Sequence, residues 1–342
     1  MKALIQSKYG GPEVLNIQEV PVPIVKPDEV LVKIHAAAVN DYDWSLMRGK
    51  PWLYRLMFGL FKPKSNIPGM ELAGIVELIG ENVTKYKVGQ SVFGDISEYG
   101  FGAFSEYVAI NENAIFLKPD FLSFTEAAGL SHAAMLAWQG LVQLGELESL
   151  ATFKKTQNKK VHILVNGAGG GMGMYALIIA KHYNAEVTGV DATEKLPGLL
   201  KLGFDYVIDY TKQDVTKISK KFDLIIDAKT KRSPFSFLKI LAKNTTFITV
   251  GGDLPRLVQI FFVSKYIKKI HHKQVKILAL KANQGLEEFY EILKNSTIKP
   301  IIDGPHSFEK TNEMIQFFGE GKHCGKIIID IAGSKLHEKG GA

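Results

Sequence analysis

Glycines recur every third position after an apolar run at residues 161–165. The spacing is G-x-x-G-x-x-G, which differs from the orthodox G-x-G-x-x-G because methionines stand where the last glycine of that motif would fall. Glycine allows a tight turn, a close approach of backbone amides to a pyrophosphate, and close helix packing, while the following helix start offers partial positive charge. The alternative is a Gly-rich loop without a ligand. The residues predicted to bind the cofactor phosphates here are Gly167, Ala168, Gly170, Gly171, Met172 and Gly173.

Asp191 directly follows a second apolar run, which ends at Val190, and a carboxylate at this place accepts hydrogen bonds from an adenosine ribose. Such a carboxylate repels a 2′-phosphate and so favours NAD(H). Thr193 and Lys195 follow within one turn and instead suit that phosphate. A third interpretation makes Asp191 the N-cap of a helix near Glu194. On these residues alone NAD(H) is slightly favoured.

Four apolar strands, at residues 161–165, 186–190, 223–227 and 246–250, are each followed by a helical pattern. Strands this apolar suit a parallel sheet covered on both faces, so we predict a doubly wound α/β domain. Ligands bind at the carboxyl ends of such strands. Val250, Gly251 and Gly252 are therefore predicted to lie on the nicotinamide side.

Short alternating strands with Gly and Pro turns fill the chain before this region, and shorter strands return after it. We therefore predict a β-rich domain at residues 1–124, a dinucleotide-binding domain at 125–263, and a return to the first domain at 264–332. Residues 333–342 are polar and small, and are expected to form a frayed tail.

Composition narrows the class of protein. The chain has 342 residues with 46% apolar content, as expected for a globular protein of two domains. Its net charge of +7 is spread through mixed sequence, which argues only weakly for polyanion binding, and no nucleic-acid partner is expected. No secretory signal or membrane-spanning run is recognised, so a cytoplasmic location is expected. The single cysteine, Cys324, excludes a zinc site with two thiolates.

Several short sequence motifs resemble those of the medium-chain dehydrogenase/reductase superfamily, specifically its zinc-free quinone oxidoreductase branch. They match in the family's order over nearly the whole chain. The motifs are Ala38-Val39-Asn40 with Asp43, Pro68-Gly69-Met70-Glu71, Lys87-Val88-Gly89, Gly102-Ala103-Phe104-Ser105-Glu106-Tyr107, the glycine loop at residues 167–173, Asp209-Tyr210, Val250-Gly251-Gly252 and Gly325-Lys326.

The resemblance implies a GroES-like catalytic domain made from both ends of the chain, an inserted Rossmann domain, and an active-site cleft between them. It also implies a homodimer and a nicotinamide cofactor, commonly NADPH in this branch. Because Asp191 favours NADH instead, the cofactor is left open as NAD(P)H.

Zinc-dependent relatives hold a catalytic metal with a cysteine and a histidine at the positions that match Asn40 and Met70. An amide and a thioether are poor zinc ligands, so we expect no metal. Without a Lewis acid, an alkoxide has no stabilising charge, whereas hydride addition to a quinone or an α,β-unsaturated carbonyl places the negative charge on a distant oxygen. We therefore expect NAD(P)H-dependent reduction of a small hydrophobic quinone or enone. The alternatives are a zinc-type alcohol dehydrogenase activity and a non-catalytic nucleotide-binding protein.

Candidate catalytic residues follow from the resemblance. Asn40 matches an asparagine near the nicotinamide and positions the ring or the acceptor, unless it only caps a turn. Asp43 more readily orders the loop than acts as a base. Tyr54, like Tyr42, is a candidate proton donor or a packed aromatic.

Three other residues have alternative interpretations. Leu136 stands where many relatives place a threonine that contacts the cofactor, so Ser131 or His132 is a candidate replacement. His132 is otherwise a core histidine. Glu71 is either structural or paired with a cation of the active site.

Two stretches lie outside the family pattern. Residues 50–61 are densely aromatic and are predicted to roof a hydrophobic acceptor pocket, with a buried helix as the alternative. Residues 261–273 join an apolar run to lysines and histidines. They suit either a contact with an anionic membrane or, as the safer interpretation, a dimer contact, and no stable membrane insertion is expected.

Overall fold

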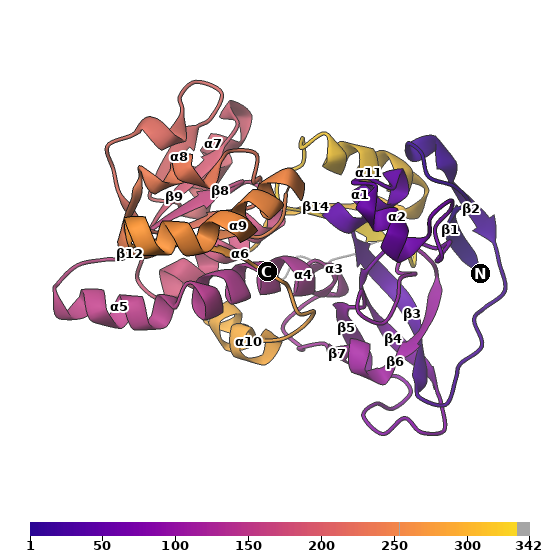
Figure 1. Cartoon of the computed structure of the whole chain (residues 1–342). Coiled ribbons are helices and arrows are strands. Elements are labelled where there is room, and N and C mark those ends of the chain that lie inside the picture. The colour runs from indigo at the N-terminus through magenta and orange to yellow at the C-terminus, as the bar shows by residue number, and fades with distance from the viewer. Residues whose placement is uncertain (253, 334–342) are drawn as a thin grey trace. The chain divides into compact units, whose positions relative to one another are not determined.

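The computed structural model describes residues 1–252 and 254–333, which divide into two units (Figure 1). Unit 1 joins Met1–His132 to the chain from Ile302 onward, and unit 2 is the segment Ala133–Ile301. The first unit therefore contains both ends of the described chain, with the second inserted into it. The two domain types predicted from the sequence are confirmed.

The main sheet of unit 1 has seven strands in the order β14-β15-β3-β4-β5-β7, with β6 also paired to β3. Most residues of its longest strand, β3, are buried, and Val30, Val32 and Ile34 on one face of that strand belong to the hydrophobic core. A separate antiparallel pair joins β1 to β2. The strands are β1 (Lys2–Gln6), β2 (Leu15–Glu19), β3 (Glu29–Ala38), β4 (Glu71–Ile79), β5 (Ser91–Asp95), β6 (Tyr107–Asn111), β7 (Phe116–Leu117), β14 (Ile302–Ser307) and β15 (Lys326–Asp330).

Short helices flank this sheet. Helix α1 begins directly after Asn40, which adopts an extended backbone, and ends at Gly49 in the left-handed conformation. The helices of unit 1 are α1 (Asp41–Arg48), α2 (Leu53–Phe58), α3 (Phe124–Ala128) and α11 (Thr311–Gly319), while α4 (Ser131–Trp138) begins in unit 1 and ends in unit 2.

Unit 2 is built on a six-stranded parallel sheet in the order β10-β9-β8-β11-β12-β13. This is the 3-2-1-4-5-6 order of dinucleotide-binding folds, in which the direction of winding reverses beside the first strand, β8. The strands are β8 (His162–Asn166), β9 (Glu186–Asp191), β10 (Tyr206–Asp209), β11 (Phe222–Asp227), β12 (Leu241–Thr249) and β13 (Gln274–Ile277). The helices are α5 (Leu147–Thr156), α6 (Gly171–His182), α7 (Leu196–Leu202), α8 (Pro234–Leu238), α9 (Leu254–His271) and α10 (Leu286–Lys294).

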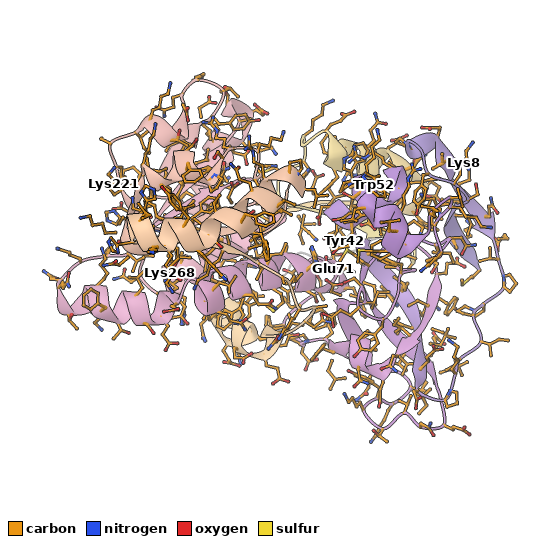
Figure 2. The ribbon with its side chains drawn as sticks, in the orientation of Figure 1. Lys8, Tyr42, Trp52, Glu71, Lys221 and Lys268 are labelled. Atoms are coloured by element: carbon orange, nitrogen blue, oxygen red, sulfur yellow. The ribbon has the colours of Figure 1, made fainter. Side chains whose placement is uncertain are left out.

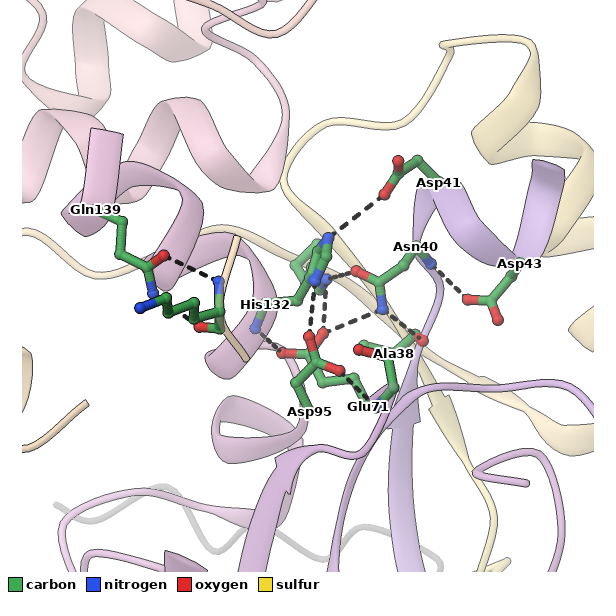
Figure 3. Close-up of polar contacts among 11 residues, drawn as sticks. Ala38, Asn40, Asp41, Asp43, Glu71, Asp95, His132 and Gln139 are labelled. Atoms are coloured by element: carbon green, nitrogen blue, oxygen red, sulfur yellow. Dashed lines mark hydrogen bonds and ion pairs between the residues drawn. The ribbon is translucent and has the colours of Figure 1, made fainter. Parts of the chain in front are cut away.

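The return to unit 1 comes at Ile302, later than the predicted residue 264. The short strand that suggested an earlier return is β13, which extends the parallel sheet beside β12. Helix α10 packs on α6 through the rings of Phe289 and Tyr175. The amide of Gln139 also donates to the carbonyl oxygens of Lys281 and Gln284, at 2.8 and 2.9 Å (Figure 3). The predicted tail lies mostly outside the described residues.

The aromatic segment at residues 50–61 is not a buried helix. Helix α2 occupies its middle, and none of the six residues of that helix is buried. Trp52 and Phe61, on either side of α2, are also exposed, and Figure 2 labels Trp52. The alternative of an ordinary core helix is therefore wrong, and the pocket-roof interpretation stays a prediction.

Candidate functional site

The glycine loop lies at the carboxyl end of β8, where the parallel sheet changes its winding direction. Gly167 adopts a φ of +90°, a conformation that disfavours side chains. A Cβ at Gly173 would lie 2.3 Å from the carbonyl oxygen of Ala168, so only glycine lets α6 approach the loop this closely. Helix α6 begins at Gly171, and its first amides have no partners within the helix. This cradle fits the pyrophosphate of a dinucleotide.

Asp191 ends β9, and its carboxylate turns toward the glycine loop. One oxygen accepts a hydrogen bond from the amide of Gly169 at 2.7 Å, and the other accepts from the amide of Ala192 at 2.9 Å. The carboxylate is therefore already engaged with the backbone. The sequence predicts that this carboxylate accepts hydrogen bonds from an adenosine ribose, whereas in the structure it accepts them from the two backbone amides.

Two lysines, Lys195 and Lys229, interact with the carboxylate of Asp191. Lys195 places its ammonium group 3.9 Å from Asp191, and both side chains are almost fully buried. Burial lowers the pKa of Lys229, while Asp191 raises it and Lys195 lowers it, which indicates that the three groups interact. The edge of the glycine loop thus carries one carboxylate and two lysines.

The predicted nicotinamide-side residues follow β12. Gly251 and Gly252 both have positive φ, at +150° and +120°, and a Cβ at Gly252 would lie 2.3 Å from the Cβ of Thr230. The hydroxyl of Thr249 donates to the carbonyl oxygen of Gly251 at 2.8 Å. The turn after Val250 is therefore closed against the end of the neighbouring strand, β11.

Unit 1 holds a buried polar cluster where several strands end (Figure 3). Glu71, the first residue of β4, pairs with Ala38 at the end of β3 and with Asp95 at the end of β5. Strand β15 pairs with the same end of β3 and begins with Lys326. Sheet register therefore brings residues distant in sequence to one place.

Lys326 forms the cationic centre of this cluster. Its ammonium group lies 2.8 Å from Glu71 and donates to the side-chain oxygen of Asn40. The amide nitrogen of Asn40 donates to Glu71 at 3.2 Å and to the carbonyl oxygen of Ala38 at 3.3 Å. Both amide hydrogens of Asn40 are thus engaged, so this side chain is fixed by the protein rather than waiting for a ligand. A paired ammonium also satisfies Glu71, which is fully buried.

His132 links two carboxylates beside this centre. Its Nδ1 lies 2.8 Å from Asp95, its Nε2 lies 3.4 Å from the exposed Asp41, and its backbone N–H donates to Glu71 at 2.8 Å. Burial alone would lower the pKa of His132, but the hydrogen bonds and charges of Asp41 and Asp95 raise it to about 10. The imidazole is therefore a cation at neutral pH. His132 is buried, as expected for a core histidine, but its positive charge was not expected from the sequence.

Asp43 acts on the loop around the cluster. Its carboxylate accepts from the backbone amides of Asn40 at 2.8 Å and Gly69 at 3.1 Å. Burial raises the pKa of Asp43 to about 7, even though these amides and Lys326 favour the charged form. These contacts fit the loop-ordering role that we expected.

The candidate proton donors are stacked on each other. The ring of Tyr54, on α2, lies parallel to that of Tyr42, on α1, with centroids 5.9 Å apart, and Tyr42 meets His132 edge-on at 6.3 Å. Burial, followed by the charges of neighbouring groups, raises the pKa of Tyr42 to about 12. Burial and then Asp41 also raise the pKa of Tyr54. Both phenols keep their protons at neutral pH.

Sequence reasoning missed Asp95 and the pairing of Lys326. The phrase Gly325-Lys326 was a usable signal, because a lysine inside an apolar strand needs a buried partner. Asp95 gave no such signal. Among the described residues, no three His, Cys, Asp or Glu side chains gather in a way that would hold a metal ion.

Replacing Gly173 by alanine tests the cradle. The added Cβ would push α6 away from Ala168, so we expect G173A to bind NADPH at least tenfold more weakly (about 1.4 kcal/mol) in a fluorescence titration. The control is G198A on α7, where a Cβ meets nothing within 4 Å. A folded G173A with unchanged affinity would contradict the assignment.

Replacing His132 by asparagine tests the buried imidazolium. Because its folded pKa of about 10 exceeds the unaltered 6.5, its stabilising effect is complete below pH 6.5 and is lost as pH rises toward 10. We expect H132N to lower the free energy of unfolding by about 3 kcal/mol at pH 6, with a difference that shrinks steadily up to pH 10. Denaturant titrations at several pH values measure this, with H182N on α6 as control. A difference that does not change with pH would refute the charged state.

The chain matches two family models. Residues 26–120 match the Alcohol dehydrogenase GroES-like domain, and residues 202–329 match the model described as Zinc-binding dehydrogenase. The solved structure of the quinone oxidoreductase from Coxiella burnetii superposes with a TM-score of 0.81 at 22% identity, covering 96% of this chain and 99% of the other. These matches agree with the two domain types described above.

Curated relatives match over almost the whole chain. The 2-methylene-furan-3-one reductase of Solanum lycopersicum is 31% identical over 96% of this chain and 79% of its own length. The NADPH-dependent alkenal/one oxidoreductase, chloroplastic, of Arabidopsis thaliana is 29% identical over 96% and 79%. The chloroplast envelope quinone oxidoreductase homolog of the same plant is 30% identical over 96% and 98%. The chain therefore belongs to the medium-chain dehydrogenase/reductase superfamily and groups with its quinone and alkenal oxidoreductases.

Proposed function

We propose that this protein transfers hydride from NAD(P)H to a quinone or an α,β-unsaturated carbonyl without using zinc. The observation that carries the proposal is the Lys326–Glu71–Asn40 arrangement. Asn40, in this arrangement, and Met70, next to Glu71 in the sequence, stand at the positions where the family resemblance places metal ligands. An amide held by an ammonium group and a buried thioether are a poor donor set for zinc.

The chemistry suits acceptors that disperse negative charge. The bound nicotinamide would supply the hydride, and the acceptor would carry the resulting charge on an oxygen remote from the attacked carbon. Asn40 and Asp43 position the loop between β3 and α1, because their polar groups are engaged within the protein. Tyr54, which holds its proton at neutral pH, is the candidate proton donor, and solvent is the other source.

The exposed segment around α2 is the proposed roof of the acceptor pocket. Its apolar side chains include Trp52, Leu56, Met57 and Phe61, all of them exposed. Such a surface is typical of a segment that contacts an apolar ligand. Tyr54 lies in the same segment, so the proposed proton donor and the proposed roof share one element.

NADPH is the proposed cofactor of choice. Asp191 is engaged by two backbone amides and lies beside Lys195, which weakens its repulsion of a phosphate. Lys195 and Lys229 add two cations at the same edge of the glycine loop. Together they favour a 2′-phosphate over a free ribose hydroxyl.

We also propose that the protein is a homodimer and that it is cytoplasmic. The dimer rests on the family resemblance alone, and light scattering after size-exclusion chromatography measures it. For location, some curated relatives have chloroplast names and others have mitochondrial names, and these locations belong to those proteins.

Cofactor oxidation with a panel of quinones and enones tests the reaction. We expect turnover with at least one acceptor class, less than about 0.1 zinc per chain by elemental analysis, and activity that survives dialysis against a chelator. About one zinc per chain together with alcohol oxidation would instead support a zinc-type dehydrogenase. Tight nucleotide binding without turnover on any acceptor would support a non-catalytic protein.

Replacing Lys195 by methionine tests the cofactor preference. We expect the ratio of kcat/KM for NADPH to that for NADH to fall about tenfold in K195M, because one charge-assisted contact to phosphate is lost. The control is K201M, which removes an exposed lysine from α7. An unchanged ratio in K195M, or a wild-type preference for NADH, would refute the assignment to NADPH.

A further inference from the structure

Helix α9 of unit 2 presents an unusual outward face (orange in Figure 1). Its buried side carries Ile260 and Ile267, which belong to the core of the unit. The opposite side exposes Phe261 and Phe262, at 71% and 73% of their surface. Apolar side chains this exposed on neighbouring positions of a helix mark a contact surface. The other exposed apolar residues of the helix are Val258, Tyr266 and Ile270.

Lysines share this face. Lys265, Lys268 and Lys269 are all exposed, and Figure 2 labels Lys268. Positions 258, 262, 265, 266 and 269 are three or four residues apart and therefore lie on one side of the helix. The C-terminal half of α9 is thus basic, while the half before it is apolar and aromatic.

The basic character extends beyond the helix. Between Asp227 and Glu287 the sequence has twelve Lys or Arg residues and a single acidic residue, a net charge of +11. Since the whole chain carries +7, all the remaining residues together carry −4. The positive charge is therefore concentrated in one stretch of unit 2, which corrects the expectation of evenly mixed charge.

Part of this charge is gathered in space beside the end of α9. Burial lowers the pKa of Lys273, and the charges of Lys221 and Lys243 lower it further, so both of these lysines lie within electrostatic range of Lys273. Lys273 also donates to the carbonyl oxygen of Leu238 at 2.5 Å. The basic character of α9 therefore continues past its C-terminal end at His271.

We propose that the outward face of α9 docks the protein on the surface of an anionic lipid bilayer. Phe261 and Phe262 would enter the boundary between headgroups and acyl chains, and the lysines would contact lipid phosphates and carboxylates. Such a contact is peripheral. Among the described residues, no helix combines the length and apolar character needed to cross a bilayer.

A second copy of the chain fits this face less well. Two α9 helices face to face would bring six exposed lysines together, and like charges across an interface oppose binding. A nucleic acid would satisfy the lysines but would leave Val258 and Ile270 without an apolar partner. An anionic bilayer complements both the charge and the apolar side chains.

Vesicle sedimentation of the full chain tests the proposal. We expect binding to phosphatidylcholine vesicles that contain about 30% phosphatidylserine, at least tenfold tighter than to phosphatidylcholine alone, and weakened by 0.5 M NaCl. The variants K265E/K268E/K269E and F261S/F262S should each lower this binding at least tenfold. Both should keep wild-type NADPH binding, which also shows that they are folded.

Matched variants come from exposed residues of unit 1. K26E/K85E/K87E makes the same charge change, and F121S makes a similar apolar change, and both should bind vesicles like the wild type. Absence of binding to anionic vesicles would overturn the proposal. So would binding that is lost in the lysine variant but kept in F261S/F262S, since this indicates general attraction to polyanions. A dimer that F261S/F262S dissociates, without vesicle binding by the wild type, would assign the face to a second copy.

Discussion

The buried ion pair between Lys326 and Glu71 is the interaction on which the polar centre of unit 1 depends. Glu71 is fully buried, so without the ammonium group it would be an uncompensated charge in the protein interior. The same ammonium group orients the amide of Asn40, and Glu71 accepts from that amide and from the backbone of His132. One cation therefore fixes the end of β3, the start of β4 and the start of α4.

The nucleotide-binding loop depends on close packing instead of charge. Gly173 brings α6 against Ala168, and Asp191 then closes the loop from the adjacent strand by accepting from Gly169. A carboxylate at the end of β9 is usually interpreted as a ribose acceptor. Here its two oxygens are engaged by the backbone amides of Gly169 and Ala192, and in our proposal the neighbouring lysines favour NADPH.

Much of the fold could be predicted from local sequence, because apolar strands and glycine turns leave short-range patterns. Strands β8, β9 and β11 begin and end within one residue of the ranges 161–165, 186–190 and 223–227 that the sequence predicts. The boundary near residue 264 was misplaced because a short strand such as β13 has the same pattern in either sheet. Tertiary packing decides that β13 pairs with β12 in the parallel sheet of unit 2.

The site was less predictable for a similar reason. Asn40, Glu71 and Lys326 stand in recognisable sequence motifs, but nothing in those motifs shows that the three side chains meet. Strand register, a long-range property, brings Lys326 to the end of β3 beside Asn40 and places Asp95 opposite Glu71. The charge of His132 likewise depends on two carboxylates from separate elements.

The placement of Lys326 also bears on how the chain acquires its structure during synthesis. Lys326 and Asn40 are 286 positions apart, whereas unit 2 is a continuous segment that is complete at Ile301. A growing chain on the ribosome thus carries Glu71 and Asn40 without their shared ammonium partner until its final strand emerges, while the inserted unit has all its strands earlier. Premature termination before β15 would leave a finished parallel-sheet unit attached to a unit whose buried Glu71 lacks its neutralising cation, which is a natural substrate for cellular quality control.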